Sequence, residues 1–278
     1  MIKRLSVTLL IDNRPQGEGL ATEHGFSLWI EADDLKIVLD SGQSSLFLQN
    51  AQKLGIDLST ADHLVLSHGH YDHTGGVREL IEKNRSVNVF CHPGIFIPRY
   101  SRKPDGSMKP IGIGRTDAAA LNNIYNSIHW TSAPTCISPD IGITGSIPRK
   151  TSFEDTGGKF YLDTGASVED PLKDDMAMWF RTKKGLVVLT GCCHSGLVNT
   201  LEYVSALQKD TPVSTILGGF HLLNASEERM EATVSYLESG NIQKLIPCHC
   251  TGDGAMDFLK RRMGGRCVQG NTGARFVF

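Results

Sequence analysis

The chain lacks several features that define protein classes. Its 278 residues contain no apolar run of roughly eighteen residues, so we expect no transmembrane helix. Its first residues hold no long apolar segment with a cleavage site, so no secretory leader is expected. The 28 Lys and Arg nearly balance the 30 Asp and Glu, which does not favour binding to nucleic acid or to an anionic membrane. We therefore expect a cytoplasmic protein.

A disulfide framework is not expected either. The chain has seven cysteines, an odd number, and Cys192 and Cys193 are adjacent, which is typical of thiols in a reducing compartment. The length allows one large domain or two modest ones, with a substantial core. The oligomeric state has no signal in the sequence.

The most informative segment is a dense group of metal-binding side chains, namely His68, His70, Asp72 and His73. An apolar run precedes them and a glycine pair follows. Imidazole and carboxylate groups are ligands of first-row metals. Because alternate side chains of an extended segment point the same way, we expect the first two histidines to converge on one ion. Asp72 and His73 follow the start of a turn and are expected to aim at a neighbouring ion. The alternative is a solvated polar loop.

This segment resembles the His-x-His-x-Asp-His motif of the metallo-β-lactamase superfamily. An Asp-Ser-Gly turn at 40–42 resembles the part of the pattern that precedes this motif. A Gly-Cys-Cys-His turn at 191–194 and a His-Cys-Thr-Gly turn at 249–252 resemble later parts of it. Together with Glu-His-Gly at 23–25 and Gly-Gly-Phe-His at 218–221, they are similar to one branch, the archaeal dihydropterin–ribofuranosylaminobenzene phosphate synthases and their bacterial relatives. The resemblance is thinnest between residues 93 and 164.

Hydrophobic periodicity predicts alternating strands and helices. Strands are expected at 6–11, 26–31, 36–39, 63–66, 87–91, 176–181, 186–189, 214–217, 244–247 and 275–278. Helices are expected at 47–54, 76–83, 197–207, 226–238 and 255–263. This order favours an α/β protein in which 1–278 form a single αββα four-layer sandwich of metallo-β-lactamase type, as the resemblance also implies.

Residues 93–164 have few periodic segments and are expected to form an irregular insertion within this domain. Two interpretations are open. The insertion is a surface segment with a solvated basic face, or it is a lid whose cations meet an anionic substrate. The cations in question are Arg99, Arg102, Lys103, Lys109 and Arg115.

His194 and His249 each follow an apolar strand and are predicted metal ligands, with a structural histidine as the alternative. The resemblance implies a bridging Asp where this chain has Cys192, so the thiolate is an alternative ligand. Asp174 or Asp175 stands near the position of a further ligand that the resemblance implies.

Other residues are expected around the metals rather than on them. His221 ends an apolar strand and is expected to contact the substrate, with Glu23 and His24 on the same rim. Asp40 is expected to orient a ligand through a hydrogen bond. Cys248 and Cys250 flank His249, and strand alternation predicts that they are buried and do not bind metal.

These features favour a metal-dependent hydrolase or transferase acting on a phosphate or pyrophosphate ester, with Asp72 orienting an attacking water or taking its proton. One or two divalent metals are expected: Zn, Mn or Fe, or Mg with a pyrophosphate substrate. The resemblance implies an anionic small molecule such as a phosphorylated pterin. The alternatives are a redox or sensory metalloprotein, suggested by the adjacent cysteines, and an RNA or DNA nuclease, which the near-neutral charge disfavours.

Overall fold

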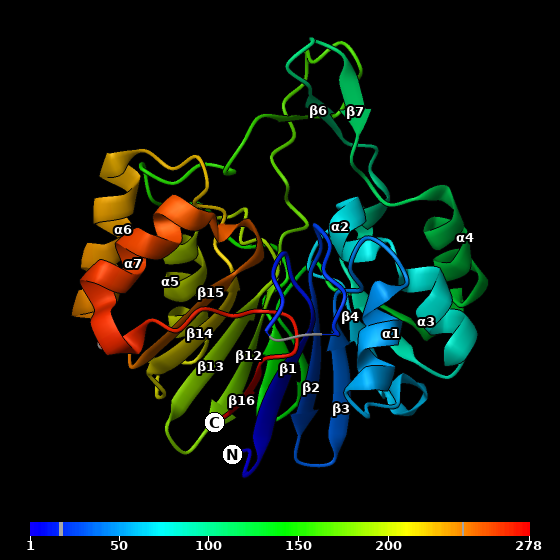
Figure 1. The fold of residues 1–278 in the computed structure, drawn as a ribbon, viewed down its shortest axis with the longest axis horizontal. Coiled ribbons are helices and arrows are strands. Elements are labelled where there is room, and N and C mark those ends of the chain that lie inside the picture. Colours follow the sequence, from blue (N-terminus) through cyan, green and yellow to red (C-terminus); the bar gives the residue numbers. More distant parts are fainter. Residues whose placement is uncertain (17–18, 241) are drawn as a thin grey trace.

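The computed structural model describes residues 1–16, 19–240 and 242–278. Two sheets lie face to face with helices on their outer sides, so the predicted αββα sandwich is confirmed (Figure 1). The first sheet has the order β16-β1-β2-β3-β4-β5-β8, and the second has the order β15-β14-β13-β12-β10-β9. A small third sheet, β11-β6-β7, lies above both of them in Figure 1.

The strands of the first sheet are β1 (Leu5–Ile11), β2 (Ser27–Ala32), β3 (Leu35–Leu39), β4 (His63–Val65), β5 (Asn88–Cys91), β8 (Ile128–Trp130) and β16 (Arg275–Val277). Those of the second are β9 (Thr135–Ser138), β10 (Ile141–Ile143), β12 (Ala177–Thr182), β13 (Gly185–Thr190), β14 (Val213–Gly219) and β15 (Lys244–Cys248). The third sheet contains β6 (Tyr100–Arg102), β7 (Met108–Pro110) and β11 (Phe160–Tyr161).

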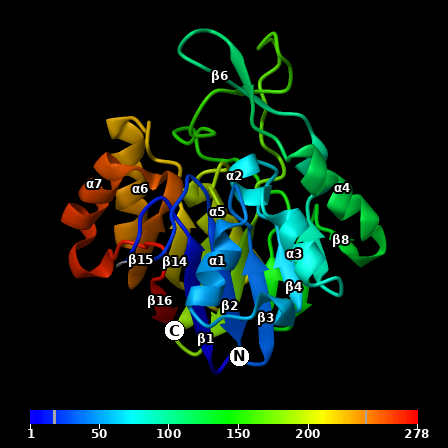
Figure 2. The same ribbon diagram turned by 45° about the vertical axis from the view of Figure 1, so that its right-hand side comes forward.

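The α-helices are α1 (Leu46–Lys53), α2 (Tyr71–Thr74), α3 (Val77–Lys83), α4 (Arg115–Asn123), α5 (Leu197–Leu207), α6 (Glu227–Ser239) and α7 (Asp253–Met263). In both views α3 and α4 lie on one side of the sandwich, and α6 and α7 lie on the other (Figure 2). None of the helices in the described ranges is long and apolar enough to cross a membrane.

Burial on both faces explains the strand sequences. Every residue of β1 and of β13 is buried, because one face meets the opposite sheet and the other meets helices. The core between the sheets includes Leu9, Leu28 and Phe180. Separate apolar layers lie beneath the helices of each side. Runs of Val, Ile and Leu therefore dominate these strands, and they made the strands recognisable in the sequence.

Parallel strands direct the connecting turns to one edge. In the first sheet β3, β4, β5 and β8 are parallel to one another, and in the second sheet β13, β14 and β15 are parallel to one another. The carboxyl ends of parallel strands lie at the same edge of a sheet. The turns after β4, β13 and β15 carry the predicted ligands, and the turn after β14 carries His221, which was expected to contact the substrate.

The structure differs in detail from the irregular insertion expected at 93–164. Here β8 extends the first sheet, while β9 and β10 extend the second, so part of this segment belongs to the main sandwich. Only β6, β7 and β11 form the separate small sheet. All six strands of the segment, β6 to β11, have two to four residues each, which is too short for a periodic pattern to reveal them.

Candidate metal centre

The turn after β4 carries four of the predicted ligands. His68 lies in the turn, His70 precedes α2, and Asp72 and His73 lie inside that one-turn helix. All four are at most 6% exposed. A Cβ at Gly69 would collide with a neighbouring backbone carbonyl, so only glycine fits between the two histidines. The chain thus turns sharply enough to gather four ligands in one buried segment.

Three turns of the second sheet face this segment. His194 follows β13, His221 follows β14, and His249 follows β15. Cys193, His221 and His249 have positive φ angles of 62°, 43° and 50°, a conformation that non-glycine residues rarely adopt. Such backbone strain persists where the surrounding structure imposes it, and it gathers at functional sites.

Three groups of side chains have ligand atoms within 4.8 Å of one another among the described residues, and two of these groups bring together residues of both sheets. The first group contains His68, Cys192 and His194, and the second contains Asp72, His73, Cys192 and His249. Cys192 belongs to both. His70 completes the cluster, with its ring centroid 4.6 Å from that of His68 and 4.9 Å from that of His194.

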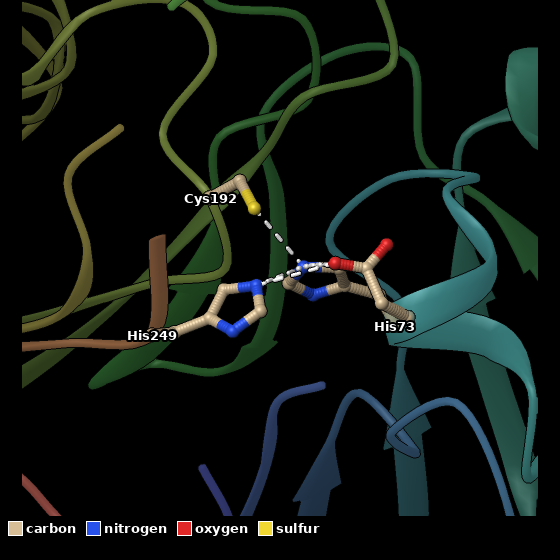
Figure 3. A group of neighbouring side chains, drawn as sticks. His73, Cys192 and His249 are labelled. Carbon is tan, nitrogen blue, oxygen red and sulfur yellow. Dashed lines mark hydrogen bonds and ion pairs between the residues drawn. The ribbon is translucent and has the colours of Figure 1, made fainter. Parts of the chain in front are cut away.

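The second group is compact. His73 Nε2 lies 3.0 Å from Cys192 Sγ and 3.2 Å from His249 Nε2. His249 Nε2 in turn lies 3.3 Å from Asp72 Oδ2. Figure 3 shows that His73, Cys192 and His249 point toward one another although they come from three separate segments.

Unpartnered nitrogen atoms test whether these residues suit a metal. Nε2 of His68, of His70 and of His194 is buried and has no hydrogen-bond partner among the described residues. The other nitrogen of two of them is occupied, since His68 Nδ1 contacts Ser67 Oγ at 3.0 Å and His194 Nδ1 contacts the Thr156 carbonyl at 2.8 Å. This is the arrangement of a metal-binding histidine, whose second nitrogen is held by a partner.

The protonation states agree with this interpretation. Burial lowers the pKa of His70 to about 3 and lowers the pKa of His68 and of His194 well below the ordinary value. These imidazoles are therefore neutral at physiological pH, which is the form that binds metal. The donor set fits one or two divalent ions.

The second group contains a charged pair. Burial would lower the pKa of His73, but the carboxylates of Asp40 and Asp72 outweigh it and raise that pKa to about 9. Burial would raise the pKa of Asp72, but His73, His24 and His249 hold it well below its ordinary value. Asp72 is therefore a carboxylate at neutral pH. The Asp40 carboxylate also accepts hydrogen bonds from the Ser67 backbone and hydroxyl, both at 2.7 Å.

The structure places Cys192 between the two groups, at the position where the sequence suggested an alternative ligand. Burial, together with the neighbouring Cys250, raises the pKa of its thiol well above the ordinary value. Contrary to the strand-alternation prediction, Cys250 is directed toward the site, where it forms a further group with Cys192 and His221. The reason is that β15 ends at Cys248 and a 3-10 turn follows, so strand alternation no longer applies.

Of the two residues predicted for the rim, His24 lies beside the ligands and Glu23 does not. His24 stacks on His249 at a centroid distance of 5.2 Å, and its Nε2 lies 3.3 Å from Asp72 Oδ2. Glu23 instead accepts hydrogen bonds from the Gln43 backbone at 2.9 Å and from the Ser44 hydroxyl at 2.6 Å. It does not line the cavity beside the ligands. Its carboxylate closes a turn instead of facing a substrate.

The two aspartates suggested as further ligands also have other partners. Asp174 pairs with Arg99 at 2.6 Å and accepts a hydrogen bond from Gly69 N at 2.9 Å. Asp175 accepts a hydrogen bond from Ser195 N at 2.8 Å and is absent from the groups above. Both support the ligand-bearing turns from behind.

A cavity of about 560 Å³ opens beside the ligands, with His70, Asp72, Cys192, His221 and His249 in its wall. Residues of the 93–164 segment complete the wall, among them Lys109 and Phe160.

Thr156 and Phe160 lie at the site but were not predicted from the sequence. Thr156 holds His194 through its backbone carbonyl, which leaves no trace in the sequence. The Phe160 ring lies 5.1 Å from the His70 ring and 5.2 Å from the His194 ring, and its sequence signal is an aromatic residue two positions after a glycine pair.

Comparisons with known proteins agree with this geometry. A family model described as the metallo-beta-lactamase superfamily matches residues 21–192. An uncharacterised protein of Methanocaldococcus jannaschii is 32% identical over 261 residues, covering 92% of this chain and 94% of that protein. The 7,8-dihydropterin-6-methyl-4-(beta-D-ribofuranosyl)-aminobenzene-5'-phosphate synthase of the same organism is 29% identical over 241 residues, covering 83% and 82%. The crystal structure of a metal-dependent hydrolase of the beta-lactamase superfamily superimposes with a TM-score of 0.81 at 29% identity, covering 98% of both chains.

Proposed function

Because the chain belongs to the metallo-β-lactamase superfamily, we propose that its two ligand groups hold divalent metals for chemistry on a phosphate or pyrophosphate ester. The protein is a metal-dependent enzyme of that superfamily. One observation carries the finer proposal: two buried ligand groups that share Cys192 open onto a cavity large enough for an organic ester.

We assign the ligands by group. His68, His70 and His194 hold one ion, and Asp72, His73 and His249 hold the other, with the Cys192 thiolate between them. Histidine and thiolate favour Zn, Mn or Fe, while Mg requires the added oxygen ligands of a pyrophosphate. When bound, such ions act as Lewis acids on phosphate oxygens and stabilise the charge of the transition state.

The protein groups around the ions have separate roles. Asp72 lines the cavity and carries a negative charge. Its low pKa makes it a weak base, so its role is to orient the attacking group through a hydrogen bond. His221 lines the same cavity, and burial and its neighbours lower its pKa to about 4, so a neutral imidazole contacts the substrate. Phe160 covers the histidines and limits the access of water to them.

Hydrolysis and transfer differ in the attacking group and in the atom that is attacked. In a hydrolase, water attacks the ester. In a transferase similar to the synthase relative, the nitrogen of an arylamine would attack a pterin carbon that bears a pyrophosphate group. A C–N bond would form, the C–O bond would break, pyrophosphate would leave and the amine would lose a proton. The cavity volume leaves room for an organic group in either reaction.

The test begins with protein purified without chelator, whose metals are identified and counted by mass spectrometry. The protein is then loaded with each divalent metal and incubated with phosphomonoesters and with organic pyrophosphates, with and without an arylamine acceptor. Release of phosphate supports hydrolysis, and release of pyrophosphate that depends on the acceptor supports transfer. Absence of both reactions with every metal would overturn the proposal.

The alternatives suggested by the sequence can be tested with the same material. A redox or sensory role requires reversible, thiol-dependent changes in metal binding. Cys193, the partner in the adjacent pair, contacts Thr200 Oγ1 at 3.4 Å and lies outside the ligand groups, which does not favour a joint role with Cys192. A nuclease role requires salt-dependent RNA or DNA binding.

A further inference from the structure

Lys109 occupies a distinct place on the cavity wall. It lies in β7 of the small sheet and is exposed, whereas the predicted ligands are buried, so its ammonium group is at the mouth of the cavity. Lys109 Nζ donates a hydrogen bond to Tyr71 Oη at 2.9 Å and lies 4.3 Å from the centre of the Tyr71 ring. These two contacts favour one position of an exposed lysine.

The backbone ties this lysine to the ligand-bearing turn. Tyr71 N donates a hydrogen bond to the Ile111 carbonyl at 2.9 Å, and His70 forms an isolated antiparallel bridge with Gly112. The strand that carries Lys109 therefore leads directly into residues 111–112, which are hydrogen-bonded to Tyr71 and bridged to His70. These backbone contacts set the distance between Lys109 and the metal-binding groups.

The charges of the wall single out Lys109. Within the described part of the chain, the lining residues with a permanent positive charge are Arg14 and Lys109. Arg14 is paired with Asp253, while Lys109 forms no ion pair with a carboxylate among the residues that the structure describes. An ammonium group has three donors, and Tyr71 uses one of them. The carboxylates of the same wall, Asp12, Asp72 and Asp253, form no ion pair with Lys109, so its remaining donors are available to another anion at the mouth of the cavity.

We propose that Lys109 binds a second anionic group of the substrate, separate from the phosphate held at the metal-binding groups. This inference rests on the proposed function and narrows its substrate class to phosphate esters whose organic part carries another phosphate or a carboxylate. The organic part spans the cavity between the two anions and packs on Phe160, which lies beside His70.

The test uses metal-loaded protein and two matched series of ligands, alkyl monophosphates and alkanediol bisphosphates of increasing chain length. Binding is measured by isothermal titration calorimetry. We expect one bisphosphate length to bind about tenfold more tightly than its monophosphate, the typical effect of one added charge-assisted hydrogen bond. We expect Lys109→Ala to remove this advantage without changing monophosphate affinity. Lys103→Ala is the matched control, because Lys103 is an exposed lysine of the same hairpin outside the cavity wall.

The outcomes separate the two proposals. If wild type binds both series equally, or if Lys109→Ala weakens both series by the same factor, the second anion site is overturned while the metal site stands. If neither series binds the metal-loaded protein, the phosphate-ester function is overturned, and the second site with it. Circular dichroism of each variant verifies that the exposed substitution leaves the fold intact.

Discussion

Asp40 Oδ2 lies 2.7 Å from His73 Nδ1, and both side chains are fully buried. The contact directs the other ring nitrogen of His73 toward Cys192 and His249. It also holds the Nδ1 proton on the side of the carboxylate, so a metal would bind at Nε2 in place of the second ring proton. A residue that touches no predicted ion directly thus controls the orientation of a ligand.

We expect Asp40→Asn to weaken metal binding by about 10- to 100-fold, the usual cost of losing the carboxylate partner of a ligating histidine. Competition with a chromogenic chelator measures this affinity. Asp62→Asn is the control, because Asp62 is an exposed residue away from the site. Its carboxylate accepts a hydrogen bond from Lys36 N at 2.8 Å. Equal affinity of wild type and Asp40→Asn would show that His73 is oriented by other contacts.

Cys192 belongs to both ligand groups, so its replacement should affect both ions. We expect Cys192→Ser to lower the bound metal from two ions to one or none, and Cys192→Asp to restore a bridging carboxylate and with it two ions. In cobalt-loaded protein, the thiolate-to-metal absorption band should vanish in both variants.

Cys193→Ser serves as the control for this experiment. Cys193 is as buried as Cys192, but its sulfur contacts the Thr200 hydroxyl and lies outside the ligand groups. Its cobalt spectrum should match that of wild type. A thiolate band that persists in Cys192→Ser would assign the sulfur ligand to another residue, Cys250 being the nearest to the site.

Arg99 is buried between two carboxylates, with Nε 2.7 Å from Asp170 and Nη2 2.6 Å from Asp174. We expect Arg99→Met to lower the free energy of unfolding by about 3–5 kcal/mol, because it leaves two buried carboxylates without their partner. Urea unfolding measures the change. Arg115→Met, at an exposed cation of the same segment, should leave it unaltered, and adding Asp174→Asn to Arg99→Met should recover part of the loss.

Asp117 provides a test of pH dependence far from the site. Burial raises its pKa, although it accepts a hydrogen bond from Arg78 N at 3.0 Å. The folded state therefore holds this proton more tightly than the unfolded state, so the contribution of Asp117 to stability falls as the pH rises from 3.8 through the raised pKa. We expect Asp117→Asn to gain stability relative to wild type over that range.

Asp57→Asn should show the opposite sign. Asp57 is exposed, and hydrogen bonds from Ser59 lower its pKa, so the ionised form stabilises the folded state. The free energy of unfolding of wild type should therefore increase relative to that of this variant as the pH rises toward 3.8. Urea unfolding of both variants across the acidic range measures the two slopes, and slopes of the same sign would contradict the assigned causes.

Local sequence patterns predicted much of the fold. Strand β13 and the turn at 68–73 were recognisable because burial on both faces requires continuous apolar residues, and because ligands must be closely spaced to meet in one turn. The strands β8, β9 and β10 were missed because three or four residues contain no period. Glu23 could not be placed correctly, since its carboxylate is used by a turn formed twenty residues later.

The sequence by itself determined the family of folds, the segment that bears the first ligands and the expectation of a metal. Tertiary structure alone decided which side chains share an ion. His73 meets Cys192 across 119 residues of chain and His249 across 176. Spacing along a chain specifies what lies within one turn or strand, whereas the pairing of parallel strands and the packing of two sheets decide which turns face each other. The placement of Thr156, Phe160 and Lys109 around the ligands follows from that packing, and it was visible only in three dimensions.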